Sequence, residues 1–168
     1  VDDMTALPYA APALAAMGLA LVALRAWVRR EIERRGKRMR PIIYTPSGRA
    51  GEYANKGQAC NLYRTCPHGC RYCYNVGMHG RKAEDYFKPA EAVPDALKRL
   101  EKDCQKHYEE PIFLSFIGDP YPCEFRSPED NITHRAIEII KASGNHVRLL
   151  TKGHVFDSDL DLLGPGDE

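Results

Sequence analysis

The sequence lacks an excess of charge of either sign. Its 24 Lys and Arg residues balance 23 Asp and Glu residues, which gives a formal net charge of +1 at pH 7. This balance argues against a nucleic-acid surface that relies on bulk positive charge, although a local basic patch stays open. With 43% hydrophobic and 28% charged residues, the composition is that of neither a disordered nor a fibrous chain.

The chain also lacks the length of a closed α/β barrel. Its 168 residues are enough for one domain with a hydrophobic core, but closed α/β barrels need more than about 200 residues. Any barrel in this chain is therefore part of a barrel. The ends indicate the same, since residue 1 is Val and the helical pattern that begins at residue 157 soon meets glycine and proline. We expect a fragment, a truncated gene product or a translated open frame, with Met39 as an alternative start.

The N-terminal segment lacks charge from residue 6 to residue 24 and is rich in arginine from residue 25 to residue 40. We expect no cleavable signal peptide here, because the segment starts with acidic residues where a signal peptide has basic ones. An uncharged run with a basic C-terminal flank is long enough to span a bilayer, so an inner-membrane anchor through residues 6–28 is the alternative to a cytoplasmic location. Alanine, two prolines and a glycine in the run favour an amphipathic helix or upstream-translated sequence instead. We divide the chain into an apolar, then Arg-rich helical segment (1–38) and a globular domain (39–168).

Within the domain, strand and helix patterns alternate. The expected elements are an extended segment at 41–46, a loop at 47–51, a strand at 59–63, a helix at 89–107, a strand at 111–117, a helix from Pro128 to about Ser143, and a strand at 146–152. The apolar run at 111–117 is typical of a strand that is buried on both faces. This β-α-β-α-β order predicts an α/β fold with a parallel sheet.

Three features set the expected helix positions. The first helix carries an apolar stripe at helical spacing, formed by Ala92, Leu97, Leu100 and Cys104. Ser127 is the predicted N-cap of the second helix, because proline follows it at the first helical position. The glycine at position 144 is the predicted end of that helix.

The six cysteines favour metal or redox chemistry over a disulfide framework. Cys66, Cys70 and Cys73 form the pattern C-x3-C-x2-C. Three thiolates this close can bind three irons of one cubane cluster and leave the fourth iron open to a substrate or cofactor. Gly69 allows the loop to fold tightly.

A structural zinc site with Cys60 or His68 as the fourth ligand is the alternative, although the spacing differs from that of common zinc fingers. We expect Cys60 and Cys104 in the core, and we assign no function to Cys123.

Further motifs accompany the cysteines. They are Asn61-Leu-Tyr-Arg64, Pro67-His-Gly69 between the cysteines, Tyr74-Asn75, Ser115-Phe-Ile-Gly-Asp-Pro-Tyr121 and Thr151-Lys-Gly153. With Tyr72 before the third cysteine, the loop resembles the C-x3-C-x-aromatic-C motif of the radical S-adenosylmethionine (radical SAM) superfamily. The whole set is similar to the spore photoproduct lyase and DNA-repair-photolyase-like branch. The resemblance runs from about residue 41 to about residue 153.

This resemblance implies a fold and cofactors. The fold would be the N-terminal part, about three β-α units, of a radical SAM partial TIM-like barrel that normally has six units, preceded here by the apolar/basic helix. Cys66, Cys70 and Cys73 would hold a [4Fe–4S] cluster, whose open iron binds the amino and carboxylate groups of S-adenosyl-L-methionine. One electron from the cluster would cleave this cofactor to give a 5′-deoxyadenosyl radical that abstracts hydrogen from a substrate.

The resemblance also implies further site residues and partners. Tyr72 would lie near the adenine, the segment from Ser115 to Asp119 would hold the methionine amino group, and Lys152 would pair with its carboxylate. A flavodoxin- or ferredoxin-like reductant is implied, and a lyase-type repair reaction on nucleic acid is the candidate activity. Two other classes stay open. One is a truncated, non-catalytic [4Fe–4S]- or zinc-binding module, and the other is a membrane-anchored accessory protein.

Overall fold

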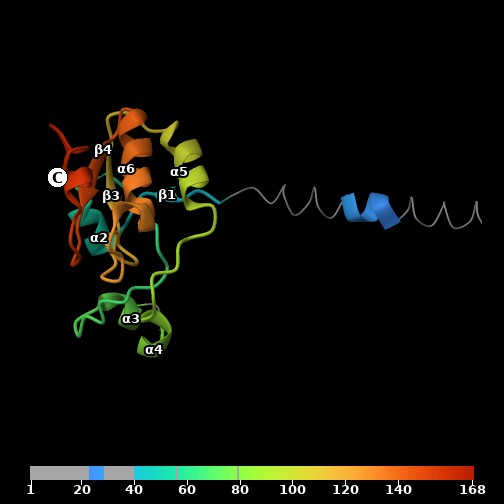
Figure 1. Cartoon of the computed structure of the whole chain (residues 1–168), viewed down its shortest axis with the longest axis horizontal. Helices are drawn as coiled ribbons and strands as arrows, with labels where there is room; N and C mark the ends of the chain where they lie inside the picture. The colour runs from blue at the N-terminus through green and yellow to red at the C-terminus, as the bar shows by residue number, and fades with distance from the viewer. Residues whose placement is uncertain (1–22, 29–39, 56, 79) are drawn as a thin grey trace, which may run out of the picture. The chain divides into compact units, whose positions relative to one another are not determined.

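The computed structural model describes residues 23–28, 40–55, 57–78 and 80–168. The chain divides into two compact units, Val1–Met39 and Arg40–Glu168 (Figure 1). In the first unit, residues 23–28 are helical and exposed, and the rest of the predicted anchor segment lies outside the described residues. Among the described helices, none combines the length and the apolar character that a membrane crossing requires.

The second unit is built on a four-stranded mixed sheet. The strands lie side by side in chain order, β1 (Ile43–Tyr44), β2 (Gln58–Cys60), β3 (Pro111–Leu114) and β4 (His146–Leu149). β1 is antiparallel to β2, whereas β2, β3 and β4 run parallel. The predicted α/β class and parallel order are confirmed, and the sheet of the described residues does not close into a barrel.

Two helices cover one face of the sheet. They are α5 (Ala96–Cys104), which precedes β3, and α6 (Ile132–Ala142), which precedes β4 (Figure 1). The core lies between these helices and the sheet, and its fully buried members include Leu62, Leu100, Ile112, Leu114, Ile137, Ile140 and Val147. Burial of each such side chain contributes about 1.5–3 kcal/mol, so this layer fixes the sheet on which the candidate site is built.

The opposite face of the sheet carries different residues, because successive side chains of a strand alternate. Phe113 is buried there, and its ring stacks on that of Phe116 at a centroid distance of 4.2 Å. Arg148 lies opposite Phe113 in the register and donates to the carbonyl of Ala54 at 2.9 Å. Ala54 follows α2 (Gly48–Tyr53), so this short helix lies near the second face. The prediction of a loop at 47–51 is therefore wrong for residues 48–51.

The helix predicted at 89–107 begins later than expected, at Ala96. Pro94 lacks an N–H group and restricts the residue before it, and Asp95 adopts a left-handed φ of 54°. Ala92 is exposed and pairs with Tyr63 in an isolated bridge. The buried stripe is therefore formed by Ala96, Leu100 and Cys104, and the assignment of Ala92 to it is wrong.

The start of α6 also differs from the prediction. Ser127 precedes a 3-10 turn, η1 (Pro128–Asp130), and makes no capping hydrogen bond. The cap of the α-helix is Asn131, whose side-chain oxygen accepts from the backbone N–H of Thr133 at 2.9 Å. The predicted end is confirmed, since α6 ends at Ala142 and is followed by Gly144 with φ 78°.

The outer edge of β4 is covered by the last residues of the chain. The N–H of Glu168 donates to Val147 at 3.0 Å, and the N–H of Leu149 donates back to Glu168 at 2.7 Å. These residues follow the short helix α7 (Asp157–Leu160). The backbone hydrogen-bonding groups at the outer edge of β4 are thus partly paired with groups of the same chain.

Candidate functional site

The cysteine loop begins where β2 ends. The strand stops at Cys60, earlier than predicted, and Asn61 leaves the sheet. The Asn61 side-chain oxygen accepts from the backbone N–H groups of Phe116 at 2.9 Å and Ile117 at 2.8 Å. Carboxyl ends of parallel strands meet at one edge of a sheet. Asn61 therefore ties the loop that follows β2 to the loop that follows β3.

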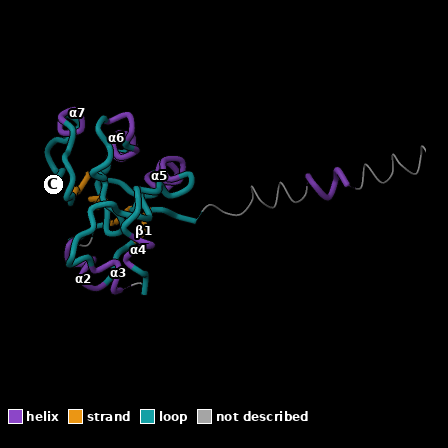
Figure 2. Tube along the Cα trace, turned by 60° about the horizontal axis from the view of Figure 1, so that its bottom comes forward, coloured by secondary structure: helices purple, strands orange, loops and turns teal. Residues whose placement is uncertain are grey.

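Two short helices continue the loop, α3 (Tyr74–Met78) and α4 (Ala83–Tyr86) (Figure 2). Asn75 is buried and donates to the carbonyl of Phe116 at 2.9 Å and to the Tyr86 hydroxyl at 3.0 Å. That hydroxyl accepts in turn from the N–H of Gly118 at 3.0 Å. The segment that follows β3 is therefore held from two sides.

Gly118 is required at this point for two reasons. Its φ is 78°, a conformation that side chains other than glycine rarely adopt. A Cβ atom would also lie 2.9 Å from the Cβ of Tyr63. The close approach keeps the segment after β3 packed against the start of the cysteine loop.

Asp119 joins this segment to the end of β4. Its carboxylate is 8% exposed and accepts from the N–H of Tyr121 and the N–H of Lys152, each at 2.8 Å, and from the Thr151 hydroxyl. His68 from the cysteine loop lies 3.5 Å from the same carboxylate, and its Nε2 lies 3.3 Å from the carbonyl oxygen of Tyr121. Both oxygens of Asp119 thus have partners within the protein.

Lys152 and Tyr72 meet on the solvent side of the same edge. The Lys152 ammonium lies 5.4 Å from the centroid of the Tyr72 ring, within the range of a cation–π contact. The pKa of Lys152 is raised, chiefly by the Tyr72 side chain and further by Cys70 and Asp119. The Tyr72 ring is 74% exposed, so one of its faces is open to a ligand.

The three motif cysteines are partly buried in this loop. Burial is the main cause that raises the pKa of the Cys66 thiol to about 11, and the neighbouring Asp119, Cys70 and Cys73 raise it further, whereas a hydrogen bond from the His68 backbone lowers it. Cys70 and Cys73 therefore lie near enough to Cys66 to act on its thiol. In the described ranges, no three His, Cys, Asp or Glu side chains are grouped as a metal site. Cluster binding stays a prediction.

The other cysteines lie away from the loop. Cys60 on β2 and Cys104 on α5 are buried in the core, and Cys123 is exposed. Burial raises the pKa of the Cys60 thiol well above its ordinary value. The core positions predicted for Cys60 and Cys104 are confirmed.

Two buried oxygens at this edge have no hydrogen-bond partner among the described residues. One is the hydroxyl of Ser115, a residue that is 7% exposed and directly follows β3, and the other is Oδ1 of Asn75. A buried polar atom without a partner is unusual and calls for an explanation. Each of the two oxygens is therefore left with the capacity to accept a hydrogen bond.

The structure thus brings the predicted site residues to one sheet edge, namely Cys66, Cys70, Cys73, Tyr72, Ser115, Asp119 and Lys152. Comparison with models of protein families, with curated proteins and with solved structures gave no match. The geometry of this edge is therefore the basis for assigning a function.

Sequence reasoning did not assign site roles to Asn61, Asn75 and Tyr86, which hold the segment after β3. It considered His68 as a fourth zinc ligand, and the structure places His68 beside Asp119. The available signal was the place of Asn61 and Asn75 on either side of the cysteines, since an amide side chain that is buried must find partners.

Proposed function

We propose that residues 40–168 are the first part of a radical SAM domain, with about three β-α units of a partial TIM-like barrel. The observation that carries this proposal is the convergence of three loops at one sheet edge. The C-x3-C-x2-C loop follows β2, the Ser115–Asp119 segment follows β3, and Lys152 follows β4. Parallel α/β proteins keep their binding sites at this edge.

The residues fit a [4Fe–4S] cluster in donor type and number. Cys66, Cys70 and Cys73 are partly exposed in one loop, and Cys60 and Cys104 are closed off in the core. At the turn of the loop, Gly69 has φ 60° and open space where a side chain would stand. Three thiolates would therefore hold three irons and leave one iron without a protein thiolate.

The neighbouring residues fit S-adenosyl-L-methionine. The free oxygens of Ser115 and Asn75 would accept hydrogen bonds from its amino group, and the Lys152 ammonium would pair with its carboxylate. The exposed Tyr72 ring packs beside the adenine. We assign Asp119 the role of holding the loops together, because both of its oxygens already have partners.

When bound, the cluster supplies the electron that reductively cleaves S-adenosyl-L-methionine into a hydrogen-abstracting radical. The electron comes from a flavodoxin- or ferredoxin-like protein. The substrate that we propose is nucleic acid, in a lyase-type repair reaction.

The second candidate function is a module that binds a [4Fe–4S] cluster without turnover. The open, four-stranded sheet favours it, because a closed site has more strands to line it. A module that binds zinc in place of the cluster has less support. The potential fourth ligand Cys60 is buried in the core, and His68 is engaged by Asp119 and the Tyr121 carbonyl.

Cleavage of S-adenosyl-L-methionine tests the proposal. The full chain is reconstituted anaerobically with iron and sulfide, reduced with dithionite and supplied with S-adenosyl-L-methionine. Methionine and 5′-deoxyadenosine are then measured by mass spectrometry. We expect both products in equal amounts, and we expect Cys73→Ala to abolish them. Cys123→Ala is the matched control and should leave product formation unchanged, because Cys123 is exposed outside the loop.

A chain that incorporates iron and sulfide but forms neither product would favour the non-catalytic module. Product formation that survives Cys73→Ala would contradict the assignment of the three thiols.

A further inference from the structure

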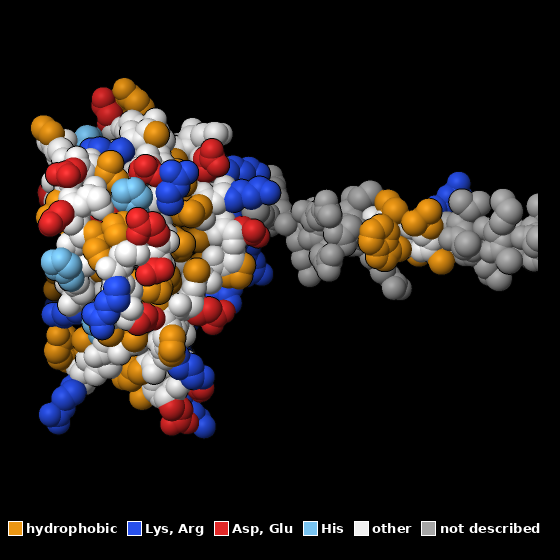
Figure 3. Space-filling model, viewed as in Figure 1, with side chains coloured by type: hydrophobic (Ala, Val, Ile, Leu, Met, Phe, Trp, Pro, Cys, Tyr) orange, Lys and Arg blue, Asp and Glu red, His pale blue; other side chains and the backbone are white. Residues whose placement is uncertain are grey.

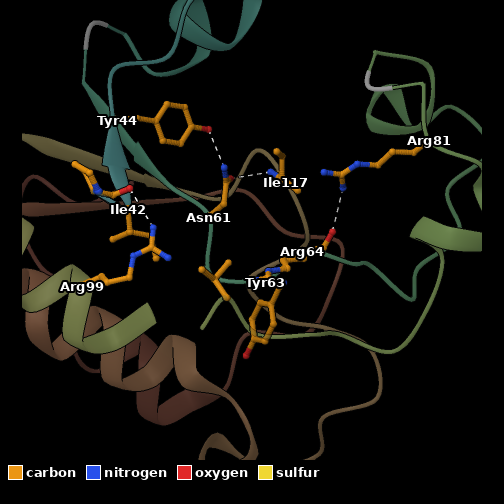
Figure 4. Close-up of a pocket in the computed structure, with 10 residues that line it drawn as sticks. Ile42, Tyr44, Asn61, Tyr63, Arg64, Arg81, Arg99 and Ile117 are labelled. Atoms are coloured by element: carbon orange, nitrogen blue, oxygen red, sulfur yellow. Dashed lines mark hydrogen bonds between the residues drawn. The ribbon is translucent and has the colours of Figure 1, made fainter. Parts of the chain in front are cut away.

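A hollow lies beside Asn61, and none of the three motif cysteines lines it (Figure 4). Its volume is about 380 Å³, which is in the range of small-molecule binding pockets. The lining comes from β1 and the segment before it, the start of the cysteine loop, the segment between α3 and α4, α5 and the segment before it, and the segment after β3. It consists of Pro41, Ile42, Tyr44, Asn61, Tyr63, Arg64, Arg81, Val93, Arg99 and Ile117.

Among the described residues that line this hollow, three carry a guanidinium group and none carries a carboxylate. Arg81 donates to the carbonyl of Arg64 at 3.3 Å and lies over the Tyr86 ring. Arg99 donates to backbone carbonyls, among them that of Pro41 at 3.1 Å. Within the part of the chain that the structure describes, neither Arg81 nor Arg99 has a carboxylate within ion-pair distance, which is notable in a chain with a net charge of only +1.

Arg64 is the exception, since it pairs with Glu91 at 3.5 Å. Both side chains are about half exposed or more, at 48% and 64%, so water screens the pair and it is worth little. An anion in the hollow can therefore compete with Glu91 for Arg64. Figure 3 shows acidic and basic side chains intermixed over one face of the molecule.

The uncharged lining residues suit a ligand that has both an anionic and a planar part. Tyr44 is 38% exposed, and its hydroxyl accepts from the Asn61 amide at 3.0 Å. Its ring offers a face on which a base can stack. Arginine recognises phosphate better than other anions because its planar fork matches two phosphate oxygens.

We propose that this hollow binds the phosphate group of a nucleotide-type ligand, through Arg81 and Arg64, with Arg99 adding charge and Tyr44 contacting the base. A free nucleotide and a single-stranded nucleic acid both present this chemistry. The proposal does not depend on the cluster or on S-adenosyl-L-methionine, neither of which is needed for the test.

Titration calorimetry of the full chain, without added iron, provides that test. The titrants are inorganic phosphate, thymidine monophosphate, thymidine without phosphate, and a short oligothymidylate, each at low and at physiological salt. We expect saturable binding of at least one phosphate-bearing titrant, none of thymidine, and weaker binding at high salt.

The variant Arg64→Gln/Arg81→Gln should weaken this binding about tenfold or more. The matched control is Arg49→Gln, which removes one positive charge at an exposed position outside the hollow and should change affinity less than twofold. Circular dichroism of each variant checks the fold, and because Arg64 and Arg81 are exposed, we expect both proteins to fold.

The titrants separate the two sources. If thymidine monophosphate binds, a free nucleotide is sufficient to occupy the hollow. If the oligothymidylate binds and the monophosphate does not, the ligand is a single-stranded nucleic acid. The proposal is overturned if no phosphate-bearing titrant binds the wild-type chain, if thymidine binds as well as its monophosphate, or if both variants lose affinity equally.

Discussion

At the scale of single residues, Asp119 makes the most connections within the candidate site. Its carboxylate accepts hydrogen bonds from the segment after β3 and from the end of β4, and it lies 3.5 Å from His68 of the cysteine loop. Asp119 therefore acts on the site by holding its loops in place.

Substitution of Asp119 tests this role. Asp119→Ala leaves the N–H groups of Tyr121 and Lys152 without their acceptor, and buried donors without partners are costly. We expect a loss of about 2–3 kcal/mol in the free energy of unfolding, measured by urea denaturation. Asp85→Ala removes an exposed carboxylate paired only with Lys88 and should cost under about 0.5 kcal/mol. Equal losses in the two variants would contradict the assignment.

At the scale of elements, the start of α6 links the helix to the site. Asn131 caps the helix, its oxygen also accepts from the Tyr63 hydroxyl at 2.7 Å, and its amide donates to the carbonyl of Pro120 at 2.8 Å. One side chain therefore connects the helix to the loop that begins at Asn61 and to the segment after β3.

The two candidate caps of α6 are predicted to differ in their effect on stability. Asn131→Ala removes the cap and leaves the buried Tyr63 hydroxyl without its acceptor, whereas the Pro120 carbonyl keeps its hydrogen bond from the Thr133 hydroxyl. We therefore expect a loss of about 2–3 kcal/mol. Ser127→Ala should cost under about 0.5 kcal/mol, because the Ser127 hydroxyl contacts the carboxylates of Glu129 and Asp130, which are both exposed. Thermal and urea unfolding measure both. If Ser127→Ala lowers the free energy of unfolding more than Asn131→Ala does, then Ser127 is the cap, as the sequence pattern predicts.

A second link joins α5 to β1. Asp103 accepts from the backbone N–H of Ile42 at 2.6 Å and pairs with Lys106 at 2.6 Å. Burial alone would raise the pKa of Asp103, but the bonds from Lys106 and from the Ile42 and Ile43 amides outweigh burial and lower it.

This lowered pKa predicts a pH dependence of stability. Because the folded pKa lies below the unfolded value near 4, the ionised Asp103 stabilises the fold above pH about 4, and that stabilisation is lost as the pH falls through the folded pKa. We expect the free energy of unfolding to fall between about pH 5 and pH 2, and to fall less in Asp103→Asn. Identical pH profiles for the two proteins would contradict this prediction.

The elements also show what the sequence could predict. The apolar run at 111–117 contains β3, and the glycine at position 144 follows α6, because each signal is local. The cap of α6 was misplaced because the choice of Asn131 over Ser127 depends on partners that are distant in sequence, Tyr63 and Pro120.

The same distinction holds for the candidate site. The resemblance to the radical SAM superfamily predicted that the cysteine loop, the Ser115–Asp119 segment and Lys152 contribute to one site. The contacts of Asn61 and Asn75 with the segment after β3 join residues about forty to fifty-six positions apart, and no local pattern reveals them. The unpartnered oxygens of Ser115 and Asn75 likewise become visible only when the chain is folded.

At the scale of the whole molecule, the central claim is that this open α/β sheet presents three thiols with one iron position left for a cofactor. Ser115, Tyr72 and Lys152 at the same sheet edge are assigned to contact S-adenosyl-L-methionine. They support the claim only if the cluster and S-adenosyl-L-methionine bind together. The binding of the two cofactors is therefore the property to measure.

The most direct measurement is low-temperature EPR of the anaerobically reconstituted, reduced full chain, recorded with and without S-adenosyl-L-methionine. The account predicts a [4Fe–4S]⁺ signal that changes shape when the cofactor is added, and that is lost in Cys73→Ala. A cluster signal that is the same with and without the cofactor, or a chain that retains zinc and forms no cluster, would contradict it.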